Sequence, residues 1–345
     1  MKFRKAYCFD DVLLVPAKSD IESRQEVDLS SEIGDCKFRL PIISSPMDTV
    51  TEGDMMMAMA RLGALGTLHR YNSAVHQASV FADTRMKLEE EGSEYSSKLA
   101  VALGSSEDYE KRAKILVDNG VRILCVDVAH GHHVLAERTI KTLKDTHGDR
   151  VLIMAGNVAT PEACYDLSEW GANAVRVGIG GGSICSTRIQ TGHGVPTFQS
   201  VLDCASIDDC VIIADGGIKN AGDIVKSLAA GADFVMLGSM LAGTDESPGD
   251  VLASNDGSKY KVYRGMASVE AQVAWRGAAR SLEGVSTTIP YKGSVAEILK
   301  SLEQNIKSGL SYSGARTIRE LQSKAKWIHQ SSAGQIESST HIMLR

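Results

Sequence analysis

The fold is clearest in residues 211–239, which read VIIADGGIKNAGDIVKSLAAGADFVMLGS. Two apolar runs, VIIADGG (211–217) and FVMLGS (234–239), flank an amphipathic stretch, AGDIVKSLAAGA (221–232), that ends at a glycine. A short, nearly continuous apolar run is typical of a parallel strand that is buried on both faces. The stretch therefore predicts two parallel strands joined by a helix.

The same unit recurs along the chain. Six further apolar runs come earlier, namely LPIISSPM (40–47), ALGTLHR (64–70), LAVALG (99–104), ILCVDVA (123–129), LIMAGNV (152–158) and AVRVGIG (174–180). Amphipathic stretches fill most gaps, and the one at 160–172 opens with Thr160 as a helix cap and Pro161 at the first helical position. Eight strands with intervening helices predict a closed (β/α)8 TIM barrel of the α/β class, with an open doubly wound sheet as the alternative. No change in composition suggests a second domain, so we expect 1–345 to form a single barrel domain with N-terminal and C-terminal extensions.

The composition argues against several classes of protein. The net charge of −6 makes a general affinity for nucleic acid unexpected. The seven cysteines form no C-x-x-C pair, so we expect reduced thiols in a cytoplasmic protein rather than a disulfide framework or a zinc site. Because we find neither a secretory signal nor an apolar stretch of about 18 residues, we also expect no membrane partner.

Small and polar residues follow almost every apolar run, and in a barrel these strand ends build the active site. The richest segment is GIGGGSICSTR (178–188), in which Cys185 follows the glycines on a loop. A thiol in such a place can act as a nucleophile, and the alternative is a flexible loop with an incidental cysteine. The carbonyl groups of the same turn could bind a monovalent cation.

The loops after the seventh and eighth runs carry Asp215-Gly216-Gly217 and Gly238-Ser239. Barrels frequently bind phosphate at this position, and glycines allow the backbone to approach an anion closely. Asp215 could bind ribose hydroxyls. The alternative is a pair of ordinary tight turns.

After the eighth run, residues 241–295 are long and without strong periodicity, which predicts a flap over the barrel mouth. Glu283 lies in this flap and could donate or accept a proton, although a solvated glutamate is the alternative. Three histidines also follow Asp127, at positions 130, 132 and 133. Their spacing matches no metal motif, so we interpret them as turn residues.

Taken together, these motifs resemble those of the IMP dehydrogenase/GMP reductase family. The resemblance covers nearly the whole chain and is carried by FDDVLLVPAKSDI, SSPMDTVTE, AGNV, GIGGGSICSTR, IADGGI, GDIVKSLAAGADFVMLGSMLAGTDESPG, YRGMAS, YKGS and SYSGARTIREL. It implies a (β/α)8 barrel that assembles as a homotetramer. It also implies attack of the cysteine on C2 of a purine nucleotide, with hydride transfer between C2 and a nicotinamide.

SSPMDTVTE and YRGM lean to the dehydrogenase branch, but four features favour the reductase. No CBS regulatory domain is present, because residues 71–98 are too short for one. Arg188 follows the Cys-x-Thr motif, and Asp127-Val128-Ala129-His130-Gly131 resembles the reductase version. The flap lacks the Arg-Tyr pair that activates water in dehydrogenases, and Arg280 precedes Glu283 by three residues, as in reductases. Gly181 departs from both branches, which often have proline or serine there.

The resemblance thus implies NADPH-dependent conversion of GMP to IMP and ammonia, with IMP dehydrogenase as the main alternative. Cys185 would attack C2, while Thr187 and Glu283 would handle protons on the departing amine. The residues that would bind the ribose phosphate are Ser183, Asp215, Gly217, Gly238 and Ser239. The further substrate contacts would be Arg264, Gly265, Met266, Ser268 and Arg280, and the nicotinamide cofactor would contact Asp127, Ala129, Gly178 and Gly180. A potassium ion would bind at Gly180, Gly182 and Cys185. A flavin-dependent barrel oxidoreductase and a non-catalytic nucleotide-binding regulator are the remaining alternatives.

Overall fold

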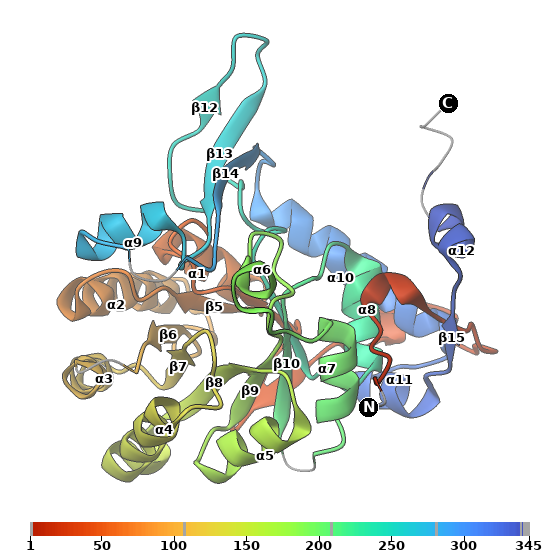
Figure 1. The fold of residues 1–345 in the computed structure, drawn as a ribbon, viewed down its shortest axis with the longest axis horizontal. Coiled ribbons are helices and arrows are strands. Elements are labelled where there is room, and N and C mark those ends of the chain that lie inside the picture. Colours follow the sequence, from red (N-terminus) through yellow and green to blue (C-terminus); the bar gives the residue numbers. More distant parts are fainter. Residues whose placement is uncertain (1–2, 106–107, 208–209, 280–281, 339, 341–345) are drawn as a thin grey trace.

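Eight parallel strands form a closed barrel in the computed structural model, which describes residues 3–105, 108–207, 210–279, 282–338 and 340 (Figure 1). Each strand pairs with the next along the chain, and the last pairs with the first through Val235–Leu237 and Ile42–Ser44. Every predicted apolar run contains one of them, so the predicted TIM barrel is confirmed and the open sheet is wrong. The strands are β4 (Ile42–Ser44), β5 (Leu65–Leu68), β6 (Ala100–Leu103), β7 (Ile123–Asp127), β8 (Leu152–Val158), β9 (Ala174–Val177), β10 (Val211–Asp215) and β11 (Phe234–Leu237).

Helices cover the outside of the barrel. They are α1 (Gly53–Arg61), α2 (Ala74–Glu90), α3 (Tyr109–Asp118), α4 (Val134–His147), α5 (Pro161–Glu169), α7 (Thr197–Cys204), α8 (Ala221–Ala229) and α10 (Val295–Tyr312). The short helix α6 (Thr187–Thr191) lies instead at the barrel mouth, where Thr187 lines the cavity. The Thr160 hydroxyl accepts a hydrogen bond from the Ala163 amide and Pro161 begins α5, as the sequence predicted. Among the described residues, no helix combines the length and apolar character needed to cross a bilayer.

The core has two parts. One lies inside the barrel, where inward-facing strand residues such as Ile43, Cys125 and Met154 are fully buried, and the other lies between the strands and the helices. A hairpin of β2 (Ser31–Ile33) and β3 (Cys36–Phe38) packs against the inner cluster, with the Phe38 ring edge-on to Phe234 at 5.8 Å between centroids. This packing fills the barrel, and the strand ends that carry polar residues form its open mouth.

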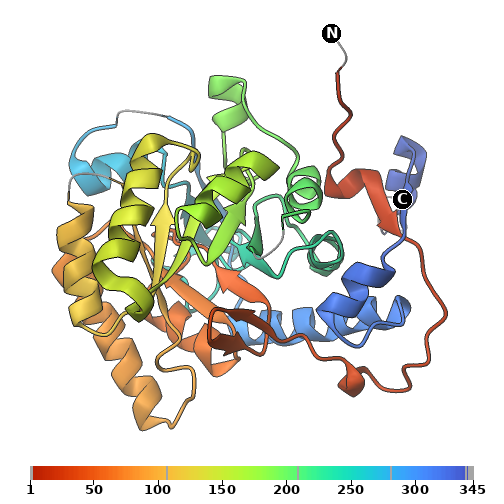
Figure 2. The same ribbon diagram turned by 90° about the horizontal axis from the view of Figure 1, so that it is seen from below.

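Segments near the two ends of the described chain lie side by side (Figure 2). Strand β1 (Val12–Leu14) pairs antiparallel with β15 (Trp327–His329), near the short helices η1 (Phe9–Asp11), α11 (Ile318–Lys324) and α12 (Ser332–Glu337). Lys226 of α8 donates a hydrogen bond to the Phe9 carbonyl at 2.8 Å, and the Phe9 ring lies close to Gly217. The N-terminal extension therefore packs against the glycine loop after β10.

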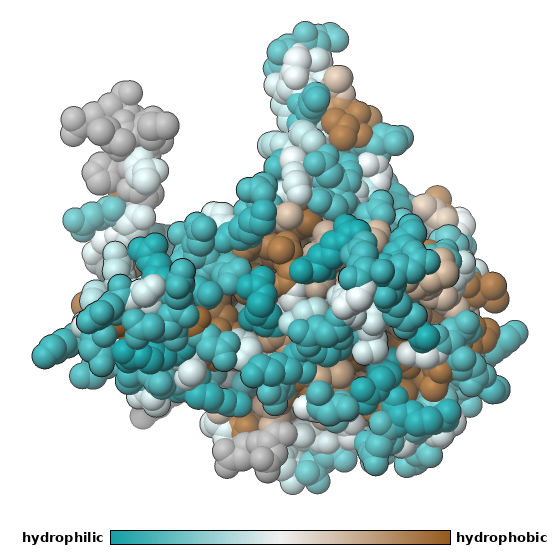
Figure 3. All heavy atoms as spheres, turned by 180° about the vertical axis from the view of Figure 1, so that it is seen from behind, coloured by the Kyte–Doolittle hydropathy of each residue, from teal (hydrophilic) through white to brown (hydrophobic). Residues whose placement is uncertain are grey.

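The segment between β11 and α10 has more regular structure than its sequence suggested. It contains β12 (Leu252–Ala253), β13 (Lys259–Arg264), α9 (Val269–Arg276) and β14 (Ser286–Pro290), and the three strands form a sheet that projects from the barrel. In β13 the polarity is inverted: Val262 is exposed, and Lys261 is buried with its ammonium group donating to the carbonyls of Thr244 and Ser247 at 3.0 and 2.5 Å. This inversion conceals the strand period from a hydropathy pattern. Figure 3 shows apolar atoms on the projecting sheet, where Val251 and Leu252 are also exposed.

Candidate active site

A cavity of about 290 Å³ opens at the carboxyl ends of the barrel strands. Its wall combines the loop after β9, the loops after β10 and β11, the end of β7, and two pieces of the flap, around 265–267 and 283–284. Most of the predicted site residues line it together: Asp127, Ala129, Gly178, Gly180, Gly182, Ser183, Cys185, Thr187, Asp215, Gly217, Gly238, Ser239, Gly265, Met266 and Glu283. Residues that are separated by up to half of the chain are thus brought to one mouth, as barrel geometry requires.

Cys185, Thr187 and Glu283 form a continuous chain of hydrogen bonds. The Cys185 thiol donates to the Thr187 hydroxyl at 3.2 Å, and that hydroxyl donates to Glu283 Oε2 at 2.7 Å. Thr187 begins α6, which holds its side chain in a fixed place beside the thiol. A proton can therefore pass between the thiol and the carboxylate through one hydroxyl group.

The flap is joined to the cysteine loop by backbone hydrogen bonds. The Ser186 amide donates to the Glu283 carbonyl at 2.9 Å, the Val285 amide donates to the Ile184 carbonyl at 3.1 Å, and Cys185 forms an antiparallel bridge with Gly284. This short ladder sets the position of Glu283 relative to the thiol. Sequence spacing alone carries no sign of it, because the two segments lie about a hundred residues apart.

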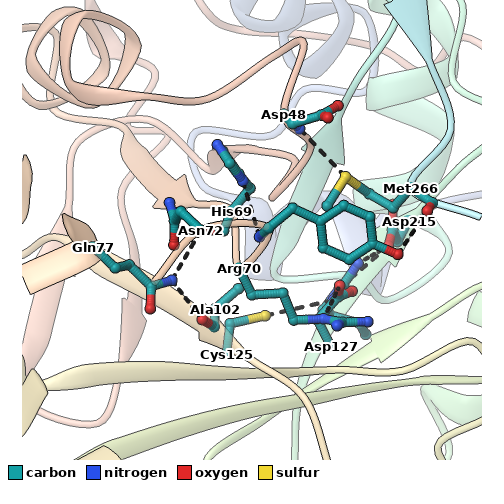
Figure 4. A network of polar contacts seen from close by, with 12 residues as sticks. Asp48, His69, Arg70, Asn72, Gln77, Ala102, Cys125, Asp127, Asp215 and Met266 are labelled. Atoms are coloured by element: carbon teal, nitrogen blue, oxygen red, sulfur yellow. Dashed lines mark hydrogen bonds and ion pairs between the residues drawn. The ribbon is translucent and has the colours of Figure 1, made fainter. Parts of the chain in front are cut away.

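A line of alternating charges crosses the barrel mouth. Arg176, which is 6% exposed, donates to Asp127 Oδ1 at 2.7 Å and to Asp215 Oδ2 at 2.9 Å. Arg70 donates to the other oxygen of Asp127 at 3.3 Å, and Asn157 donates to Asp215 at 2.8 Å. Figure 4 shows Arg70, Asp127 and Asp215 together in this network.

These contacts decide the charge of Asp127. Burial raises its pKa, but the positive charges of Arg176 and Arg70 outweigh the effect of burial and hold the pKa below the ordinary value. Asp127 is therefore a carboxylate at neutral pH and can accept hydrogen bonds from a ligand. Arg176 and Asn157 were not among the predicted site residues, although an arginine inside an otherwise apolar strand is a signal that could have marked the first of them.

The glycine loops at one end of the cavity suit a phosphate group. Gly178 has a φ of +151°, and a Cβ atom there would lie 1.9 Å from the Asp215 carbonyl oxygen, so the two loops meet backbone to backbone. Gly217, with a φ of +79°, also requires a conformation that favours glycine. Tyr263, near the end of β13, is buried in the cavity wall, where its hydroxyl lies close to Gly238. Tyr263 was not among the predicted contacts, even though it belongs to the quoted YRGM motif.

The remaining predicted substrate residues lie differently. The Arg264 guanidinium is paired with Asp48 at 2.6 Å, and the Ser268 hydroxyl caps α9 by accepting from the Ala271 amide at 3.2 Å. Neither is part of the cavity wall, so their predicted roles would require new contacts when substrate binds. Arg280 lies outside the described residues.

Of the predicted cation ligands, the Gly182 carbonyl accepts a hydrogen bond from the Cys185 amide at 3.1 Å. The potassium site stays a prediction. In the nearby histidine turn, His132 pairs with Asp166 at 2.8 Å. Within the described part of the chain, no group of three or more His, Cys, Asp or Glu side chains could hold a metal ion.

The fold and the site define a (β/α)8-barrel enzyme with a thiol at the cavity wall and glycine loops at the barrel mouth. Residues 6–341 match the family model described as "IMP dehydrogenase / GMP reductase domain", and the chain belongs to this family. The family consists of oxidoreductases that use nicotinamide cofactors. The resemblance inferred from the motifs is thus confirmed at the level of the family.

Similar proteins carry the names of both branches. The chain is 34% identical to the inosine-5'-monophosphate dehydrogenase of Nitrosopumilus maritimus, covering 100% of both chains, and 32% identical to the GMP reductase of Leishmania donovani, covering 96% of both. Its fold matches a crystal structure of a cysteine-to-alanine variant of GMP reductase from Trypanosoma brucei in complex with guanosine 5'-monophosphate, with a TM-score of 0.89, 30% identity and 98% coverage of both chains.

The two curated relatives contain segments that this chain lacks. Their alignments run over 476 and 473 positions, whereas this chain has 345 residues. The relative named as a GMP reductase is therefore as extended as the one named as a dehydrogenase. Chain length consequently does not separate the two branches, whereas the chemistry of the site can.

Proposed function

We propose that this protein is a GMP reductase, which converts GMP and NADPH to IMP, ammonia and NADP. The observation that carries this proposal is the chain from the Cys185 thiol through the Thr187 hydroxyl to the Glu283 carboxylate. A reductase must deliver a proton to a departing amine at the carbon that the thiol attacks. These hydrogen bonds connect the Glu283 carboxylate to that thiol through a single hydroxyl group.

Cys185, Thr187 and Glu283 suffice for the first step, which is the loss of ammonia from C2. As the Cys185 sulfur bonds to C2 of GMP, the thiol proton passes through Thr187 to Glu283, and Glu283 returns a proton to the 2-amino group. The C2–N bond breaks, ammonia leaves, and the purine remains bonded to sulfur as a thioimidate. A reduced nicotinamide, when bound, would supply the hydride that C2 accepts. The carbon–sulfur bond then breaks, IMP is released, and the thiolate takes up a proton.

The two ends of the cavity would bind different ligands, the nucleotide phosphate and ribose at one end and the cofactor at the other. Gly217, Gly238 and Ser239 would hold the phosphate with backbone groups, and Asp215 would bind the ribose, in contact with the buried Arg176. At the other end, Asp127 and Ala129 would bind the cofactor. The carboxylate of Asp127 is an acceptor of the kind that the carboxamide and ribose of a nicotinamide nucleotide require. Assembly as a homotetramer, a potassium requirement and a cytoplasmic location belong to the same proposal.

IMP dehydrogenase is the second candidate, because the motifs SSPMDTVTE and YRGM favour it. In addition, relatives of both names share a similar percentage of identical residues with this chain. A dehydrogenase must hydrolyse the thioimidate and therefore needs a base that activates water. In this flap neither Arg276 nor Arg280 precedes a tyrosine. The group that the flap does bring to the thiol is the Glu283 carboxylate, which can take up the thiol proton and pass it to the departing amine.

The test compares both reactions in the same preparation. Purified protein is given GMP with NADPH or IMP with NAD, and nicotinamide absorbance and released ammonia are followed. We expect NADPH oxidation with one ammonia per IMP. Cys185→Ala should abolish turnover and keep GMP affinity, whereas Cys8→Ala, outside the cavity wall, should leave the rate unchanged. Robust NAD reduction on IMP with no reaction on GMP would assign the dehydrogenase instead.

A further inference from the structure

Tyr71 is a cavity residue to which neither the motifs nor the proposed chemistry assigns a role. It follows β5 in the loop that leads to α2, and it lines the cavity beside Arg70. Its hydroxyl donates to the Met266 carbonyl at 2.7 Å. Its ring lies nearly parallel to that of Trp275 in α9, with 13° between the planes and 5.9 Å between the centroids. One side chain of the barrel thus holds the flap by a hydrogen bond and by a ring contact.

The barrel holds Tyr71 firmly on its own side. The Tyr71 amide donates to His69 Nδ1 at 3.1 Å, and the Arg70 guanidinium lies 5.3 Å from the ring centroid. Burial raises the pKa of Tyr71, so the side chain remains a hydroxyl donor across the neutral range. Asp48 adds a neighbouring contact, since its amide lies 3.3 Å from the Met266 sulfur, as Figure 4 shows.

Met266 is connected to the acid–base residue through the flap itself. The Gly265 amide donates to the Val285 carbonyl at 3.0 Å. Gly265 also packs so closely on Gly284 that a Cβ atom there would lie 3.3 Å from the Gly284 Cα atom. The turn that carries Met266 and the segment that carries Glu283 are therefore side by side, so a shift of one is expected to move the other.

We infer that Tyr71 is a positioning residue that holds the flap against the barrel and thereby sets the place of Glu283 over the thiol. The inference rests on the proposed function, because it names the residue that aligns that site for amine departure. The flap is held by backbone hydrogen bonds to the cysteine loop, by the Arg264–Asp48 ion pair, and by Tyr71, which is the contact made directly to the Met266 carbonyl. Loss of the Tyr71 contact would leave Cys185 and the phosphate loops in place, but Glu283 would be held less firmly beside the thiol.

The first test separates the hydroxyl from the ring. Tyr71→Phe removes only the hydrogen bond to Met266, and we expect kcat with GMP and NADPH to fall by about fivefold to tenfold, with KM for GMP changed by less than about twofold. Trp275→Leu should lower kcat by a similar factor, and Trp275→Phe, which keeps an aromatic face, should restore most of it. Tyr95→Phe is the matched control, since Tyr95 is also partly buried against a cation, Lys98 at 4.5 Å, but lies outside the cavity wall. It should keep the wild-type rate.

The second test needs no turnover and therefore stands apart from the proposed function. Limited proteolysis in the presence of saturating GMP reports whether the flap stays closed, and alkylation of Cys185 reports whether GMP is bound. We expect Tyr71→Phe and Trp275→Leu to be cleaved in the flap at least about threefold faster than wild type, with GMP still protecting the thiol. Unchanged kcat and unchanged cleavage in Tyr71→Phe would overturn the inference. Faster cleavage in a protein that turns over neither GMP nor IMP would support the anchor while removing the proposed reaction.

Discussion

Replacing Thr187 by valine is the sharpest test of the proton path, because valine keeps the branched shape and removes only the hydroxyl. That hydroxyl lies 3.2 Å from the Cys185 sulfur and 2.7 Å from Glu283 Oε2, so it is the link between the two groups. Proton transfer by a positioned side chain contributes about 10²–10⁴-fold to a rate. We expect kcat for GMP reduction to fall by about 300-fold, which corresponds to a barrier higher by about 3.4 kcal/mol.

The assay follows NADPH oxidation at saturating GMP, with Thr187→Ser as the matched control. Serine keeps the hydroxyl and loses the methyl group that restricts its rotation, so it should retain activity within about tenfold of wild type. KM for GMP should change by less than about threefold in both variants, since the phosphate and ribose contacts remain. If Thr187→Val retains more than half of the wild-type kcat, Thr187 is not in the proton path and the mechanism is refuted.

Three further predictions concern the framework of the site. Asp215→Ala removes one partner of Arg176, which is 6% exposed, and should lower the free energy of unfolding by about 3 kcal/mol in urea titrations; an unchanged midpoint would contradict the buried pairing. The pKa of Asp127 is held below its ordinary 3.8, so its contribution to stability is present at neutral pH and is lost as the pH falls through the folded-state pKa. In Asp127→Asn the free energy of unfolding should therefore fall less steeply as the pH is lowered below 3.8, and an unchanged pH dependence would argue against the depressed pKa. Gly178→Ala should destabilise the protein by more than about 2 kcal/mol by thermal unfolding, because a Cβ atom would lie 1.9 Å from a backbone oxygen, whereas Gly92→Ala, at a φ of +71° with open space around it, should cost about 1 kcal/mol.

Local pattern was enough to predict the barrel and the cysteine loop. Each strand is a buried run whose hydropathy does not depend on distant partners, and eight such runs in sequence leave few alternatives to a closed barrel. The same reasoning placed Cys185 and Asp215 at the barrel mouth, because the end of a strand is defined by the strand itself. These predictions used only neighbours along the chain.

Contacts between distant segments could not be obtained in this way. Arg176 lies in an apolar run, and only the closed barrel shows that Asp127 and Asp215 approach it from two other strands. The flap was predicted as irregular because β13 exposes a valine and buries Lys261, whose charge is compensated by carbonyl groups earlier in the same segment. No sequence pattern marks Tyr71, because the contact that defines its role is a hydrogen bond to the Met266 carbonyl, about 200 residues away. Hydropathy and residue spacing predict which residues are buried and which secondary structure they form. Which distant residues contact one another is decided only by packing in three dimensions.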